Sequence, residues 1–375
     1  MKTKIHNLVR LYFGKFINSK LNCMSKTVQL TLLLCIAALI GKSQPWSEKL
    51  YAHPSSFCSS GCTVNNNTPF GFLMGGFNPL AATNSPNFYI DRTKTGGQFG
   101  GGLFSNDYFV YGDNACASNA PQASGFYGVS VIETPNTGAN TPNFVVAGAF
   151  DEGCFYSSLS STGATITTKF FPFPVGAMSI TKPLIVESLN TAYDYFICGS
   201  YSIGGVQKMY VIKLNLAGTV LQSKLYTTTN PNGGDLFPNG LIYSPYGTEL
   251  VIVGKAANLG SGGGVEDRAF FIKLNDNSLA INFSNLYGKV ASALNTDYFT
   301  TIAAAPSATP GSAGYAIGGY TDFSTTNGLV WTLKVNAAGT IINNCNWISL
   351  PFSDGGAKDV VGLVERYSNT YGTTY

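Results

Sequence analysis

The sequence predicts an all-β protein: a β-propeller of four-stranded antiparallel blades, with about five blades and the start of a sixth. One unit of about 50–70 residues recurs along the chain, as in proteins built by stacking similar sheets. Each clear unit holds four short apolar segments separated by Gly, Asn and Ser. No stretch after residue 45 shows a helical period. Four strands per unit at this period are typical of a propeller blade.

The repeat is clearest in three units. They read "FICGSY…MYVIKLNLAGTV" (196–220), "VIVGKA…FFIKLNDNSLAI" (251–281) and "AIGGYT…VWTLKVNAAGTI" (316–341). Looser copies lie at 72–99 and 145–166, and a sixth unit begins at Asp359. The apolar segments predict the strands of the fourth unit at 241–243, 250–253, 269–274 and 279–283, and those of the fifth at 300–304, 315–317, 329–335 and 340–343.

Glycines mark two positions of the unit. The tight turn between the third and fourth strands ends in a Gly that can adopt positive φ, at Gly96, Gly163, Gly218 and Gly339. Ser278 replaces this Gly in the fourth unit, so Asn277 is expected to be left-handed there. The second strand carries Gly75, Gly148, Gly199, Gly254 and Gly318. A Gly inside a strand marks a bulge or a close backbone approach, and the alternative is that these positions line a ligand funnel.

Aspartates recur at a fixed spacing of 62 residues, at Asp235, Asp297 and Asp359, each expected to stand shortly before the first strand of a unit. Regularly spaced carboxylates could be metal ligands. A repeated turn or strand-start hydrogen bond is the preferred interpretation, because a role that is identical in every blade is structural, whereas catalysis breaks the symmetry.

The first 44 residues differ in composition from the rest. They contain seven Lys/Arg, no Asp or Glu, and the apolar run Leu30–Ile40, which is too short to span a bilayer. This pattern predicts a secretory signal cleaved near Ser43 or Gln44. Met24 opens a complete signal of its own, so 1–23 is alternatively a mis-assigned start. An uncleaved anchor helix is the other alternative.

Removing this leader changes the net charge from +3 to about −4, so the basic balance belongs to the export signal and gives no basic surface for nucleic acid. No transmembrane segment is expected after cleavage. The remaining chain divides into an N-terminal segment at 45–69 and the propeller repeats at 70–375, which are expected to be truncated at the C-terminus, with further blades or another chain closing the ring.

Six cysteines follow the leader, and export permits disulfides. Cys58 with Cys62, or Cys116 with Cys154, could form a bridge, although six cysteines allow fifteen pairings. Cys198 lies inside an apolar strand and is expected to be a buried free thiol.

The segment "WTLKVNAAGTI…ISLPFSDGGAKDVVGLVER" at 331–366 resembles the secreted bacterial β-propeller repeats of the SBBP or delta-60 type. Their pattern is an apolar strand, Lys-Leu-Asn, a Gly turn, a Gly-rich segment, Asp, and the next strand. The resemblance covers about 180–360 well and 70–180 poorly. It implies a propeller of an exported Bacteroidetes-type protein, and it implies no single activity.

No catalytic or cofactor motif emerges, and neither a cofactor nor a metal site is expected. Only His53 lies outside the leader, which argues against a Ser-His-Asp triad or a His-ligated metal. The leading hypothesis is an exported propeller with a non-enzymatic binding, adhesion or scaffold role at the cell surface and a glycan or protein ligand. The alternative is a carbohydrate-active hydrolase or lyase that uses loop carboxylates, for which the candidates are Asp151, Glu152, Glu266 and Asp267.

Overall fold

The computed structural model describes all the strands named below and, between 126 and 342, most of the connecting residues. Within that range the structure does not describe residues 135–142, 151–152, 161–162, 164, 191–193, 229–233, 260–266, 289–295, 306–312 and 322–328. Apart from these gaps, side chains are described from 128 to 321 and from 331 to 342. The chain divides into two units, Met1–Pro54 and Ser55–Tyr375. The first unit, with the predicted leader, lies outside the described residues. In the described part, no helix has the length and hydropathy to cross a membrane.

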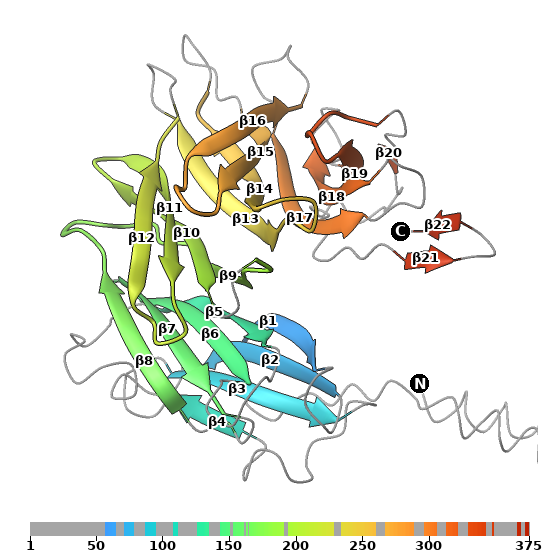
Figure 1. The fold of residues 1–375 in the computed structure, drawn as a ribbon. Helices are drawn as coiled ribbons and strands as arrows, with labels where there is room; N and C mark the ends of the chain where they lie inside the picture. The colour runs from blue at the N-terminus through green and yellow to red at the C-terminus, as the bar shows by residue number, and fades with distance from the viewer. Residues whose placement is uncertain are drawn as a thin grey trace, which may run out of the picture. The chain divides into compact units, whose positions relative to one another are not determined.

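The described strands confirm the predicted all-β fold of four-stranded antiparallel blades (Figure 1). Five such sheets follow one another along the described chain, each with its strands in sequence order. Blade 1 contains β1 (Phe57–Val64), β2 (Gly71–Asn78), β3 (Asn87–Lys94) and β4 (Tyr108–Tyr111); blade 2 contains β5 (Phe126–Glu133), β6 (Phe144–Phe150), β7 (Gly153–Leu159) and β8 (Thr165–Pro172). Blade 3 contains β9 (Leu184–Glu187), β10 (Tyr195–Ile203), β11 (Val206–Leu214) and β12 (Val220–Tyr226).

Blade 4 contains β13 (Asp235–Tyr243), β14 (Glu249–Ala257), β15 (Arg268–Asn275) and β16 (Ile281–Tyr287); blade 5 contains β17 (Asp297–Ala305), β18 (Gly314–Thr321), β19 (Leu329–Asn336) and β20 (Trp347–Ile348). A two-stranded hairpin of β21 (Arg366–Ser368) and β22 (Gly372–Thr374) stands where the sixth unit was expected.

Two predicted boundaries were wrong. The sequence predicts an N-terminal segment at 45–69 ahead of the repeats, but β1 lies within it and pairs with β2, so the first blade begins at Phe57 and not at residue 70. The fourth strand of the fifth unit was expected at 340–343. Only Ile341 forms an isolated bridge there, with Val335, and the paired strand is β20.

The glycines of the second strands lie beside a recurring irregularity. In blades 1, 2, 4 and 5 the pairing of the first strand with the second strand shifts register near the glycine of the second strand. In blade 4, for example, the shift lies between Pro238, which pairs with Gly254, and Gly240. Each Gly of blades 2 to 4 also faces an aromatic residue on the third strand, in the pairs Gly148↔Phe155, Gly199↔Tyr210 and Gly254↔Phe270. A Cβ on Gly148 would lie 2.2 Å from the Phe155 ring, so the missing side chain makes room for the aromatic ring. In these three blades the glycines therefore have a packing role.

The turn between the third and fourth strands follows the expected chemistry with one correction. Gly218 and Gly339 have φ of +73° and +84°, and each donates its N–H to the carbonyl of the Asn three residues earlier. In blade 4 the turn is one residue longer, since Leu279 donates to the Asn275 carbonyl. Leu279, with φ of +50°, is the left-handed residue, and the expectation for Asn277 was wrong.

The hydrophobic cores lie between consecutive blades. The core between blades 3 and 4 includes Phe196, Val211, Ile252 and Ile272, and similar cores join blades 2 to 3 and 4 to 5. Because each sheet is too thin to bury apolar surface by itself, stacked blades stabilise one another.

Tyrosine hydroxyls connect the same pairs of blades. Tyr226, at the end of β12, donates to the Leu279 carbonyl in the turn of blade 4 at 2.6 Å, and Tyr287, at the end of β16, donates to the Gly339 carbonyl in blade 5. Tyr156 of β7 makes the corresponding bond to the Leu216 carbonyl at 2.9 Å. A buried phenol thus satisfies a turn carbonyl in each following blade.

Candidate binding groove between blades 3 and 4

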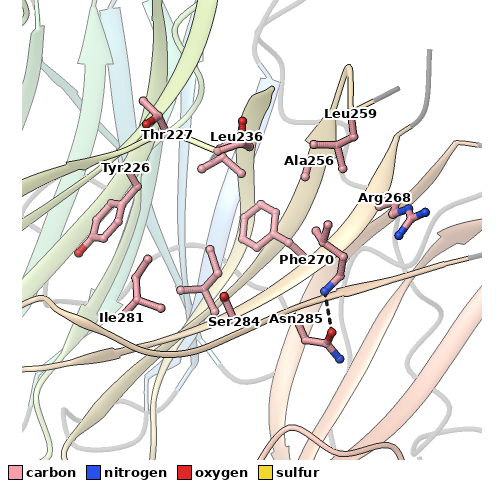
Figure 2. Close-up of a pocket in the computed structure, with 13 residues that line it drawn as sticks. Tyr226, Thr227, Leu236, Ala256, Leu259, Arg268, Phe270, Ile281, Ser284 and Asn285 are labelled. Carbon is pink, nitrogen blue, oxygen red and sulfur yellow. Dashed lines mark hydrogen bonds between the residues drawn. The ribbon is translucent and has the colours of Figure 1, made fainter. Parts of the chain in front are cut away.

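A groove of about 690 Å³ opens between blades 3 and 4 (Figure 2). One side is formed by the end of β12 and the residues after it, Tyr226, Thr227 and Thr228. The other side is formed by residues from all four strands of blade 4 and by Leu259. The groove therefore exists only because two successive blades pack against each other.

The floor of the groove is apolar. Leu236, Ala256, Phe270 and Ile272 line it, and each is less than a tenth exposed. The rim on β16 is apolar too but open to solvent, since Ile281 is 50% exposed and Leu286 is 44% exposed. Exposed large apolar side chains beside a buried apolar floor are typical of a surface that binds another molecule.

Six of the thirteen lining residues carry polar side-chain groups: Tyr226, Thr227, Thr228, Arg268, Ser284 and Asn285. Asn285 accepts a hydrogen bond from the Leu286 N–H through Oδ1 at 3.0 Å (dashed in Figure 2). The Tyr226 hydroxyl is already bonded to the Leu279 carbonyl, and burial raises the pKa of this phenol. Arg268 supplies the only formal charge among the described lining residues. This set can hold an apolar ligand, but it offers no pair of catalytic acid and base.

A smaller groove of about 310 Å³ occupies the equivalent place between blades 2 and 3. Its lining from blade 3 includes Tyr210, Ile212, Ser223, Lys224 and Leu225. Tyr210 pairs with Leu225, as Phe270 pairs with Leu286 in blade 4, so the two grooves use matching positions. The repeat therefore builds the same kind of site twice, and the copy between blades 3 and 4 is the larger.

The recurring aspartates tie neighbouring segments together. Asp235, the first residue of β13, accepts hydrogen bonds from the Gln207 N–H of blade 3 at 2.7 Å and from Asn258 Nδ2 at 2.6 Å. Asp297, the first residue of β17, accepts a bond from the Thr321 hydroxyl. Both carboxylates therefore accept hydrogen bonds at the start of a strand. Asp359 lies outside the described residues, and within the described ones no His, Cys, Asp and Glu side chains gather as a metal site would require.

The candidate disulfide residues are placed as follows. Cys58 and Cys62 both lie in β1, whose side chains are outside the described residues, so their pairing stays a prediction. Cys154 is a buried free thiol, and Cys116 lies outside the described residues. Cys198 is a buried free thiol as well. Burial raises the pKa of both thiols, which makes them poor nucleophiles.

Among the candidate loop carboxylates only Asp267 is described, and it has structural partners. It is 8% exposed, forms an ion pair with Lys255 at 3.2 Å, and accepts a hydrogen bond from the Asn258 N–H at 3.2 Å. Asp151, Glu152, Glu266 and His53 lie outside the described residues.

Sequence reasoning did not single out Glu187. It lies at the end of β9, the first strand of blade 3, and burial raises the pKa of its carboxyl to about 7. The pKa of the Tyr156 phenol in blade 2 is raised mainly by the burial of that phenol, and the negative charge of Glu187 raises it further. The residue type alone gives no such signal, because the shift depends on how neighbouring blades cover the strand.

This shift predicts a pH dependence of stability. The unfolded carboxyl ionises near its ordinary pKa of 4.5, whereas the folded one ionises near 7, so the free energy of unfolding falls as pH rises through this window. Glu187→Gln is expected to have no effect at pH 4 and to stabilise the protein by about 1 kcal/mol at pH 8, allowing for solvent screening. Urea denaturation at both pH values checks this. An equal change at the two pH values would contradict it.

Comparison with known proteins gives no family. No protein-family model matches the chain, and no curated protein matches it. Solved structures with a similar arrangement include the Dos1 propeller, with 10% identity, a TM-score of 0.40 and coverage of 84% of this chain and 89% of that one. Sqt1 from Chaetomium thermophilum shows 12% identity, a TM-score of 0.36 and coverage of 77% and 71%. A Synechocystis apocarotenoid oxygenase mutant shows 13% identity, a TM-score of 0.33 and coverage of 72% and 60%. The fold assignment therefore rests on the four-stranded blades of the chain itself.

Proposed function

We propose that this protein is an exported β-propeller that acts by binding, with a polypeptide partner held at the groove between blades 3 and 4. The observation that carries the proposal is this groove, with its buried apolar floor and its exposed rim of Ile281 and Leu286. A partner that inserts apolar side chains would remove this surface from water, at a gain of about 25 cal/mol per Å² of apolar area.

The groove favours a polypeptide over a glycan. Sugar rings are bound by stacking on exposed aromatic faces, but the aromatic residues here, Tyr226 and Phe270, are 4% and 1% exposed. The exposed lining residues are the aliphatic Ile281 and Leu286 and the polar Thr227, Ser284 and Asn285, a mixture that suits a polypeptide with both apolar side chains and backbone hydrogen-bonding groups.

The extracellular location is supported by the sequence. The basic, apolar leader at 1–44 has the composition of a secretory signal, and the chain that follows it has few charges and many turns. The proposed setting is therefore the cell exterior, as a secreted or surface-held protein.

The proposal is tested by filling the groove. Thr227 is exposed on the β12 side, so Thr227→Trp is expected to occupy the cavity and abolish binding to an array of immobilised peptides, while leaving the melting temperature unchanged. Thr219→Trp, which adds the same ring to the exposed turn before β12, is the matched control and is expected to bind like the unmodified protein.

Two results would overturn the proposal. One is binding to a parallel glycan array with no peptide binding. The other is hydrolysis of polysaccharides at enzyme-like rates, which would favour the loop-carboxylate alternative.

A further inference from the structure

The larger groove, between blades 3 and 4, and the smaller groove, between blades 2 and 3, correspond position by position. In each, an aromatic residue of the third strand faces the glycine of the second strand: Phe270 in the larger groove and Tyr210 in the smaller one. An isoleucine follows two positions later and pairs with a serine of the fourth strand, as Ile272 with Ser284 and Ile212 with Ser223. The aromatic residue, the isoleucine and the serine line both grooves. The two grooves can therefore be compared residue by residue.

The smaller groove already holds an aromatic side chain of the chain itself. Phe173 stands between Pro172 and Pro174, just after β8, and lines this groove. Its ring packs on Tyr201 at a centroid distance of 4.9 Å and on Tyr210 at 5.4 Å. It is half-buried and packs against the hydrophobic core between the two blades. A phenylalanine between two prolines is thus what fills part of the smaller groove.

The larger groove has small residues at the positions of two of these rings. Phe173 lies three residues beyond the fourth-strand residue that pairs with the aromatic of the third strand, and the same count in β12 gives Thr228. Tyr201 lies two residues after the glycine of its strand, and the same count in β14 gives Ala256. Thr228 and Ala256 both line the larger groove, which has more than twice the volume of the smaller one. The additional space therefore coincides with the two missing rings.

We propose that the larger groove binds a phenylalanine side chain, next to a proline, of the polypeptide partner. The ring fills the space beside Ala256 and Phe270, as the rings of Phe173 and Tyr201 fill the space beside Tyr210. The partner backbone takes a path of its own, because residues 226–228 of this chain already hold the place that 171–173 hold at the smaller groove. This inference rests on the proposed function and names the side chain that the groove selects.

A phenylalanine next to proline suits this space for two physical reasons. Its ring removes more apolar area from water than a valine or alanine side chain can, and aromatic rings in offset or tilted contact attract one another further. The tilted contacts of Phe173 at the smaller groove are of this kind. The neighbouring proline restricts the backbone of the free peptide, so less conformational entropy is lost on binding.

Fluorescence anisotropy with a labelled peptide that copies Pro172–Met178 (PFPVGAM) tests the proposal on the purified full-length protein. The peptide is expected to bind, and replacing its single Phe by Ala is expected to raise the Kd about tenfold or more. The protein variant Ala256→Tyr installs the residue of the smaller groove and is expected to lose binding, because the added ring fills the space.

A second variant opens a site instead of filling one. Phe173→Thr installs the residue type of the larger groove in the smaller one, and it is expected to raise the peptide stoichiometry in isothermal titration calorimetry from one to two. Leu189→Thr is the matched control, since it removes an apolar side chain that is 69% exposed and lines neither groove; it is expected to keep a stoichiometry of one. Circular dichroism checks that each variant is folded.

The outcomes separate this inference from the proposed function. No binding of the peptide, equal Kd values for its Phe and Ala forms, or one bound peptide on a folded Phe173→Thr variant would overturn the inference. The proposed function would still stand if other peptides of the array bind and Thr227→Trp abolishes that binding. An array on which no peptide binds would remove both.

Discussion

Replacing Gly254 by Ala is expected to lower the free energy of unfolding by about 3 kcal/mol, the cost of overpacking at a rigid site. A Cβ at this position would lie 2.0 Å from the Phe237 carbonyl oxygen and 2.9 Å from the Phe270 ring. The first is a backbone atom of β13, so the contact is relieved only by moving the paired strand. Chemical denaturation measures the loss directly.

Gly247→Ala is the matched control. Its Cβ would find its nearest heavy atom, Glu249 Oε2, at 3.8 Å, which is an ordinary contact. This substitution is expected to be neutral or to stabilise by about 0.5 kcal/mol, because Ala restricts the unfolded chain more than Gly does. Equal stabilities of the two variants would contradict the packing role assigned to the second-strand glycines.

Lys273→Met is expected to destabilise the protein by about 2 kcal/mol. The Lys273 Nζ forms an ion pair with Glu249 at 2.5 Å and donates to the Ala337 carbonyl of blade 5 at 2.9 Å, and its side chain is 12% exposed. Removing the Lys273 ammonium leaves the mostly buried Glu249 carboxylate without its counter-ion and the Ala337 carbonyl without this hydrogen-bond donor. The contact between blades 4 and 5 is weakened as a result.

A second substitution separates charge from packing. Adding Glu249→Gln to the Lys273→Met variant is expected to recover part of the loss, because the uncompensated carboxylate is removed. Lys208→Met, at a half-buried lysine of β11, is the control and is expected to change stability by less than about 0.5 kcal/mol. No recovery in the double variant would show that Lys273 acts through packing alone.

The repeat made the blades predictable because buried second and third strands carry long apolar runs. The edges of the blades were less predictable. β1 reads FCSSGCTV and β16 reads INFSNLY, so neither has the apolar density that marks a central strand. Hydrogen-bonded pairing also extends strands into polar residues, as at Asp235 and Asp297, which begin their strands instead of preceding them.

The groove could not be predicted, because it needs two blades in contact. Tyr226 and Phe270 are 44 positions apart in the sequence, and nothing local indicates that they line one cavity. The raised pKa of Glu187 has the same origin, since burial by neighbouring blades causes it.

Hydrogen–deuterium exchange with and without a peptide selected on the array tests the binding role of the groove most directly. Bound peptide is expected to slow exchange at 226–228, on the β12 side of the groove, and to leave the β10–β11 turn at 204–205 unchanged. Protection of that turn, with no change at 226–228, would contradict the account and place the binding site elsewhere on the blades.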